Sequence, residues 1–274
     1  MPPTEVHLIG EYHFDLFAYP RYQRAFSLLQ PDTISIETDR ERVAAGVESL
    51  KLFLEAGYGS YKEAIKHLPS FNFEALVALH GLAGVFAAKS YPLKQNPVTI
   101  ALIDSLSVQT KGTIEYTFSS PANPTEENEN LEDWKGFLEE PNPYEKVLIE
   151  ALGRDEWIQY SDQGLTIPQA LLVGLVRISA CANRKQLSET NLIMDRIYHL
   201  PINLSNHNFS NFEVQRRDDA MLEQILSQPG KVIHAGGIAH FFGNYHNLYE
   251  RLKEKGLNVT RHKLIEFEGN NQQP

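Results

Sequence analysis

Residues 6–13 read Val-His-Leu-Ile-Gly-Glu-Tyr-His, a short apolar run that stops at a glycine and is followed by a histidine. An apolar run bounded by glycine is typical of a buried strand. A helical pattern opens at Pro20 and continues to Gln30, and the β-branched run Thr33–Ile36 follows it. Two strands joined by a helix of this length form a right-handed βαβ unit, so this stretch predicts an α/β fold with parallel strand pairing.

Three further strands are predicted nearer the middle and the end of the chain. Pro97–Ile103 is apolar, Lys231–Ala235 stops at a pair of glycines, and Asn258–Phe267 carries the last strand pattern. We therefore expect a central, mainly parallel sheet built from both ends and the middle of the chain, with a large helical insertion. We expect one domain, 1–274, with helical insertions at about 40–95 and 144–228 and a loop-rich excursion at 105–142.

The segments between these strands carry apolar residues near the helical period. Asp39 could cap the first helix of the insertion, because aspartate is a preferred N-cap. Ser119–Pro143 is predicted as a solvated loop, since it holds four prolines and a run of Glu and Asn. The helices expected after Gln30 cover residues 39–56, 73–90, 144–152, 166–183, 188–198, 212–227 and 245–255.

Composition narrows the class of protein. Hydrophobic residues make up 42% and charged residues 22% of the chain, so a packed core is expected rather than disorder. The net charge of −10 argues against nucleic acid or an anionic membrane as partner. The first residues carry no secretory signal and no apolar run is long enough to span a bilayer, so we expect a soluble cytoplasmic protein without membrane insertion. The single cysteine, Cys181, excludes a Cys-rich zinc site and is expected to be a small buried hydrophobe.

Several catalytic motifs are missing from the sequence. It contains no Gly-x-Ser-x-Gly elbow, no phosphate-binding glycine loop, no Gly-x-Gly-x-x-Gly after the first strand and no His-Glu-x-x-His helix. Serine hydrolases, nucleotide-binding proteins and zincins therefore become poor explanations of this chain.

Polar groups follow the predicted strands at four places, and functional groups of parallel sheets gather just past the carboxyl ends of strands. The four groups are Gly10–His13, Glu37 with Asp39, Asp104, and Gly237–His240. Each of the two Gly-x-x-His motifs directly follows a strand, and glycine allows the sharp turn and close backbone approach that would present the histidine. If the two strands are neighbours, His13 and His240 meet at one edge of the sheet, where Glu37 could join them.

Two imidazoles with a carboxylate can hold zinc, manganese or cobalt with an open position for water. In this hypothesis His13, Glu37 and His240 are the ligands and Glu11 takes a proton from the metal-bound water. The alternative is structural, because a histidine at a strand end is often a satisfied polar group and a carboxylate there often caps a helix. Asp39 and Asp104 remain open between the two interpretations.

Arg217 lies in a charged run, Gln215–Met221, on a helix that leads into the last motif. An arginine near carboxylates can orient a carboxylate or stabilise an oxyanion. The alternative is a solvated helix face with local ion pairs. His7 and His234 lie within strands and are expected to be buried structural residues.

Five pieces of this sequence resemble the TraB/TIKI family, part of a wider superfamily that includes erythromycin-esterase-like and ChaN-like proteins. They cover both ends of the chain in the family's order, while residues 110–210 match nothing in it. The pieces are Val6–His13, Pro31–Glu37, Ile100–Asp104, Arg217–Met221 and Val232–His240, followed by Gly243.

The resemblance implies a site. The family pairs two Gly-x-x-His motifs with a glutamate and an arginine, which fall at His13, His240, Glu37 and Arg217 here. TIKI members are metal-dependent peptidases, some relatives cleave proteins or esters, and ChaN-like members bind haem. The Gly-Glu-x-His form at residues 10–13 is closer to the esterase and ChaN-like side, where a glutamate beside the motif histidine takes part.

Two classes of function follow as expectations. The first is a hydrolase, metal-dependent in its main form, that cleaves a peptide or ester bond in a small-molecule or peptide substrate. In a metal-free form Glu11 or Glu37 activates water and the histidines polarise the carbonyl. The second is a binding protein that holds haem or a peptide in the same crevice without turnover, with Tyr12 as the residue placed to bind a haem iron. A weaker third hypothesis is an interaction protein, in which the same scaffold no longer has a working site. The oligomeric state is not predicted.

Overall fold

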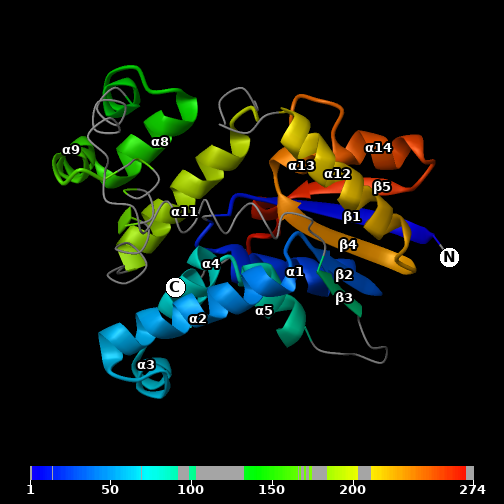
Figure 1. The fold of residues 1–274 in the computed structure, drawn as a ribbon, viewed down its shortest axis with the longest axis horizontal. Helices are drawn as coiled ribbons and strands as arrows, with labels where there is room; N and C mark the ends of the chain where they lie inside the picture. Colours follow the sequence, from blue (N-terminus) through cyan, green and yellow to red (C-terminus); the bar gives the residue numbers. More distant parts are fainter. Residues whose placement is uncertain are drawn as a thin grey trace. The chain divides into compact units, whose positions relative to one another are not determined.

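The computed structural model describes residues 2–13, 15–68, 70–91, 99–102, 133–165, 167, 170, 173–174, 184–202 and 211–269. Its strands are β1 (Pro3–Glu11), β2 (Thr33–Ile36), β3 (Thr99–Leu102), β4 (Gly230–Gly237) and β5 (Val259–Lys263). They form one sheet in the order β3-β2-β4-β1-β5, and every neighbouring pair is parallel. The predicted α/β fold, with a parallel sheet drawn from both ends and the middle of the chain, is confirmed (Figure 1).

The chain divides into two compact units. One comprises Met1–Ser107 and Pro201–Pro274 and contains the sheet, and the other is Val108–Leu200. The second unit includes α8 (Pro143–Leu152), α9 (Arg154–Asp162) and α11 (Arg184–His199). The expectation of a single domain stays a prediction.

The order of the strands creates a topological switch point at one edge of the sheet. From β1 the chain passes through α1 (Ala18–Leu29) to β2, on the far side of β4. From β4 it passes through α13 (Ala239–Phe242) and α14 (Leu248–Glu254) to β5, on the far side of β1. The two connections leave neighbouring strands in opposite directions. A switch point of this kind is where doubly wound α/β sheets place their ligands.

Helices cover both faces of this sheet (Figure 1). On one face, Val6 and Leu8 pack in a buried cluster with residues of α12 (Asn211–Leu226), α13 and α14. On the other, α1 contacts α4 (Ser70–Leu79) and α5 (Ala83–Ser90). Alternate residues of a strand point to opposite faces, so a strand covered on both sides is apolar throughout, as β1 is from Val6 to Ile9 apart from His7.

Several predicted elements need correction. The single helix expected over residues 73–90 is two helices, α4 and α5, because the chain turns at Gly81 with a left-handed φ of 67°. The helix expected from Tyr245 begins at Leu248, where the side chain of Asn247 caps it. The last strand ends at Lys263 and a 3₁₀ helix, η2 (Leu264–Phe267), follows it.

The insertion also holds more helix than its sequence predicts. α2 (Arg40–Tyr58) is capped by Asp39 as expected, but α3 (Tyr61–His67) and α9 were not predicted. Within the expected loop 119–143, residues 133–139 are helical and bury Trp134 and Phe137 against Trp157. Most of the helix expected at 166–183 lies outside the described residues, as do Asp104 and Cys181. In the part of the chain that the structure describes, no helix has both the length and the apolar character needed to cross a membrane.

Candidate functional site

Polar residues at the ends of three neighbouring strands, β1, β4 and β2, lie at the switch point. The last residue of β1, Glu11, pairs with the last residue of β4, Gly237. Glu37 directly follows β2, and its backbone N–H donates to the carbonyl of Ala235 in β4 at 2.8 Å. Parallel strands end at the same edge of a sheet, so residues about 200 positions apart in the chain become neighbours here.

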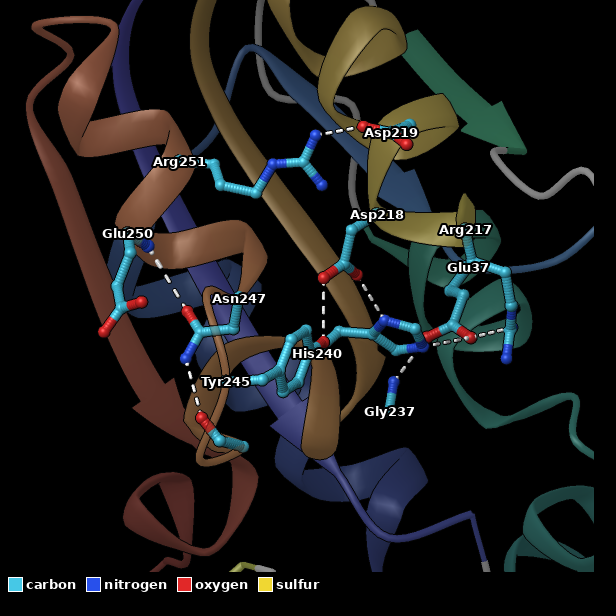
Figure 2. A network of polar contacts seen from close by, with 11 residues as sticks. Glu37, Arg217, Asp218, Asp219, Gly237, His240, Tyr245, Asn247, Glu250 and Arg251 are labelled. Atoms are coloured by element: carbon cyan, nitrogen blue, oxygen red, sulfur yellow. Dashed lines mark hydrogen bonds and ion pairs between the residues drawn. The ribbon is translucent and has the colours of Figure 1, made fainter. Parts of the chain in front are cut away.

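Glu37 lies at the centre of the site (Figure 2). Its side chain is 2% exposed. One carboxylate oxygen accepts a hydrogen bond from the guanidinium of Arg217 and lies 3.4 Å from Nε2 of His240. The other accepts the backbone N–H of Gly237 at 2.6 Å. Burial raises the pKa of Glu37, but the positive charges of His240 and Arg217 outweigh burial and hold this pKa well below its usual value of 4.5.

His240 lies between two carboxylates. Its Nδ1 is 2.5 Å from Oδ1 of Asp218, and its Nε2 faces Glu37. Burial lowers the pKa of His240, while the charge of Glu37 and the hydrogen bond with Asp218 raise it to about 9. The histidine is therefore an imidazolium at neutral pH, with a hydrogen on each ring nitrogen.

Asp218 and Tyr245 complete this network, and sequence reasoning missed the role of both. Asp218 is fully buried and accepts hydrogen bonds from His240 and, at 2.8 Å, from the hydroxyl of Tyr245. Asp218 directly follows Arg217 on α12, so one turn of helix supplies both the cation on Glu37 and the carboxylate on His240 (Figure 2). The charged run at 215–221 was the only sequence signal, and nothing in it linked Asp218 to a histidine 22 residues later.

His13 differs from His240 because its side chain is 62% exposed. Its Nδ1 lies 3.2 Å from Oε1 of Glu11. Desolvation lowers the pKa of His13, but the hydrogen bond and charge of Glu11, together with the charge of Glu37, raise it above 6.5. In the neutral imidazole, a hydrogen on Nδ1 is donated to Glu11 and the lone pair of Nε2 is left free. A Cβ atom on Gly237 would lie 3.1 Å from that nitrogen, so His13 Nε2 sits over Gly237 beside the buried network.

The glycine pair at the end of β4 leaves room for these side chains. A Cβ atom on Gly236 would lie 2.5 Å from Oε2 and 3.0 Å from Cβ of Glu37. Glu37 cannot retreat, because its two oxygens are held by Arg217, His240 and the N–H of Gly237. A side chain at position 236 would therefore disturb the site.

We expect Gly236→Ala to lower the free energy of unfolding by about 1–3 kcal/mol through overpacking. Gly57→Ala is a matched control, because no atom lies within 4 Å of its Cβ position in α2 and alanine favours a helix by about 0.5–1 kcal/mol. Denaturant unfolding of both variants measures the difference. Equal stability of the two variants would contradict this account of the glycine pair.

The metal site of His13, Glu37 and His240 stays a prediction. His240 carries a hydrogen on the nitrogen that faces Glu37, and Arg217 occupies the same carboxylate oxygen. Among the described residues, no group of three or more His, Cys, Asp or Glu side chains is positioned to hold a metal ion.

The remaining predicted residues lie elsewhere. Asp39 caps α2 by accepting the N–H of Arg42 at 2.8 Å, which is the structural alternative for this residue. His234 is fully buried and its Nδ1 lies 2.9 Å from the hydroxyl of Ser35. Burial lowers the pKa of His234 to about 4, so it is a neutral structural histidine.

The site thus combines Glu37, Asp218, Arg217 and His240 in a charge-balanced buried network with the exposed pair Glu11–His13 beside it. The carboxylates of this network hold the positive charges of Arg217 and His240 in place. The exposed imidazole of His13 can exchange a proton with a bound molecule. No known protein family, no curated protein and no solved structure matches the chain.

Proposed function

We propose that the protein is a hydrolase that cleaves an ester or peptide bond by acid–base catalysis, with His13 as the general base. The observation that carries this proposal is the exposed imidazole of His13, oriented by Glu11 and directed over Gly237. A carboxylate-oriented histidine is the commonest general base in hydrolases. The role of Glu11 is then to orient His13 rather than to take the proton itself.

In the proposed reaction, Nε2 of His13 removes a proton from water as the water oxygen adds to the substrate carbonyl carbon. The carbonyl oxygen gains negative charge, which the guanidinium of Arg217 stabilises. His13 then returns the proton to the leaving oxygen or nitrogen as the bond to it breaks. Glu37, held by His240 and Gly237, keeps Arg217 at the edge of the buried network, where 15% of the arginine side chain is exposed.

The contacts support the metal-free form of this reaction over the metal-dependent one. Both oxygens of Glu37 are engaged with donors, and His240 offers no free lone pair to a metal while it is protonated. The metal-dependent hydrolase, with His13, Glu37 and His240 as ligands, is the other outcome of the test below.

The binding function receives less support. A haem iron held by tyrosine takes the phenolate form, and Tyr12 is the residue beside the first motif. Burial raises the pKa of Tyr12 to about 12, which disfavours the phenolate. A small-molecule or peptide substrate, a cytoplasmic location and the lack of a nucleic acid partner stay predictions.

A panel of chromogenic esters and fluorogenic peptides tests the function directly. We expect hydrolysis of at least one class, and we expect the rate to be unchanged after treatment with a strong chelator because no step requires a metal. Zinc, manganese and cobalt are added back separately to the chelated sample. Loss of activity on chelation that one of these ions restores would favour the metal-dependent form, and no turnover across the panel would argue for a binding protein.

A further inference from the structure

Positive charge is concentrated on β5 and on the helix that packs against it, α14 (Figure 1). Five of the 25 Lys and Arg residues of the chain lie within residues 251–263, and the only acidic residue among them is Glu254. The whole chain has a net charge of −10. This segment is therefore opposite in sign to the protein as a whole.

Three of these cations are joined through two aromatic rings. The ammonium of Lys253 lies 5.4 Å from the centroid of the Tyr249 ring. The guanidinium of Arg261 lies 4.4 Å from the Tyr249 centroid and 4.7 Å from the Phe242 centroid. The ammonium of Lys263 lies 5.6 Å from the Phe242 centroid. Lys253, Arg261 and Lys263 form a cationic row, in which contacts with the rings hold each charge in place without neutralising it.

The cationic row is poor in acidic partners. Among the described residues, no carboxylate forms an ion pair with Lys253 or Arg261, and both side chains are exposed. The nearest acidic residues in the sequence have other contacts. Glu254 pairs with a histidine of the preceding loop at 3.0 Å, and Glu266 accepts the backbone N–H of Lys263 at 2.9 Å. The row therefore presents positive charge to a molecule that approaches this edge of the sheet.

Arg261 is the most firmly held cation of the row. It packs against two rings, and its guanidinium donates one hydrogen bond to the carbonyl of Phe241 at 2.8 Å. A guanidinium has five N–H donors, so most of them are still available to a carboxylate. Because the group is already oriented, less side-chain freedom is lost when it binds.

The backbone of β5 has an open edge beside the row. Among the described strands, β5 pairs only with β1. The N–H of Val6 donates to the carbonyl of Asn258 at 2.9 Å, and Val6 lies opposite Val259 in the parallel register. Alternate residues of a strand face alternate neighbours, so the backbone groups of Thr260 point toward β1 and those of Arg261 point outward. An edge of this kind can accept an additional strand.

The spacing of the cations on β5 matches the repeat of such a strand. Arg261 and Lys263 are two residues apart, so their side chains lie on one face of the sheet, about 6–7 Å apart along the strand. An added strand with acidic residues at alternate positions would place one carboxylate opposite each cation. Cross-strand pairs of opposite charge stabilise a sheet.

We propose that the cationic row and the outer edge of β5 form a docking surface for an acidic segment of a partner protein, which adds to the sheet as an extended strand. Its carboxylates contact Lys253, Arg261 and Lys263, and its backbone pairs with the outward groups of β5. The surface does not suit single-stranded nucleic acid, because cations already lie over the rings on which bases would stack and the net charge repels a polyanion.

A labelled peptide in which glutamate alternates with threonine is the probe, and the same peptide with glutamine in place of glutamate is its control. We expect the full chain to bind the acidic peptide more tightly by fluorescence anisotropy at low ionic strength. Replacement of all three cations of the row by glutamine should weaken this binding about tenfold, because each exposed ion pair contributes modestly. The matched control variant is Lys51→Gln, Lys62→Gln and Lys66→Gln, which removes three exposed charges from α2 and α3.

Hydrogen exchange measured by NMR tests whether the peptide adds as a strand. The backbone N–H of Arg261 should become protected when the acidic peptide binds, whereas that of Thr260, which already faces β1, should change little. Binding that leaves the Arg261 amide unprotected would overturn strand addition. This comparison uses the wild type, so it holds even if the row variant does not fold.

Equal affinity for the acidic and the glutamine peptides would overturn the docking surface, and so would equal losses in the two triple variants. These results would leave the cations with the role of keeping other strands away from the edge, which charged residues have on many sheets. Sedimentation adds one more outcome. A wild-type dimer that dissociates in the row variant would show that a second copy occupies this surface and would overturn the acidic partner. None of these measurements depends on whether the protein hydrolyses a substrate.

Discussion

His13→Ala should lower kcat by about 10²–10⁴-fold, the usual contribution of a general base. The stability of the fold should change little, since the His13 side chain is 62% exposed and its hydrogen bond with Glu11 is exposed as well. The measurement is kcat on a substrate found in the ester and peptide panel, with the thermal midpoint determined in parallel. His67→Ala is the matched control, because His67 is an exposed histidine whose carboxylate partner, Glu63, lies at 3.3 Å on α3.

The pH dependence of kcat/KM sharpens this prediction. A general base acts in its neutral form, so activity should fall as the pH drops through the pKa of His13, which Glu11 holds above 6.5. Glu11→Gln removes that carboxylate charge and should move the acid limb of the profile to lower pH. An acid limb that stays in place in Glu11→Gln, or a kcat that His13→Ala leaves unchanged, would assign the base to another residue.

The sheet could be predicted because its signals are local. The run Val6–Ile9 before a glycine, the β-branched Thr33–Ile36 and the apolar run before Gly236 each mark a strand within a few residues. The sequence does not contain the strand order, which depends on how helices pack against the two faces. The break between α4 and α5 depends on a single residue, Gly81, whose left-handed φ lets the chain turn there. A single glycine in a helical pattern does not by itself show that the helix ends.

The site, like the sheet, could be predicted from the sequence only in part. Residues that directly follow strands, His13, Glu37 and His240, could be placed at one edge of the sheet because parallel strands end together. The role of each depends on contacts that sequence spacing does not encode. The metal role of His240 stays a prediction, and nothing in the spacing pointed to the contacts of its ring with the buried Asp218 of α12 and with Glu37.

Glu37→Ala should have the largest effect on stability. It leaves the guanidinium of Arg217 and the imidazolium of His240 buried without their shared carboxylate. Removal of one partner from a buried ion pair typically lowers the free energy of unfolding by about 3–5 kcal/mol. Asp39→Ala, two residues along the chain, is the matched control, since loss of a helix N-cap costs about 1 kcal/mol. Denaturant unfolding at pH 6 separates the two, and equal losses would show that the network contributes no more than a cap.

The same network makes stability depend on pH from both sides. The pKa of Glu37 is lowered by folding, so its contribution is present above 4.5 and is lost as the pH falls below that value. The pKa of His240 is raised from 6.5 to about 9, so its contribution is complete below 6.5 and is lost as the pH rises through 9. Glu37→Ala removes the contribution of the Glu37 carboxylate to stability. It also lowers the pKa of His240, because the charge of Glu37 is the largest of the effects that raise that pKa. The loss of stability between pH 6.5 and 9 should therefore be smaller in Glu37→Ala than in the wild type or Asp39→Ala, and an unchanged slope would mean that Glu37 does not hold His240 in its charged form.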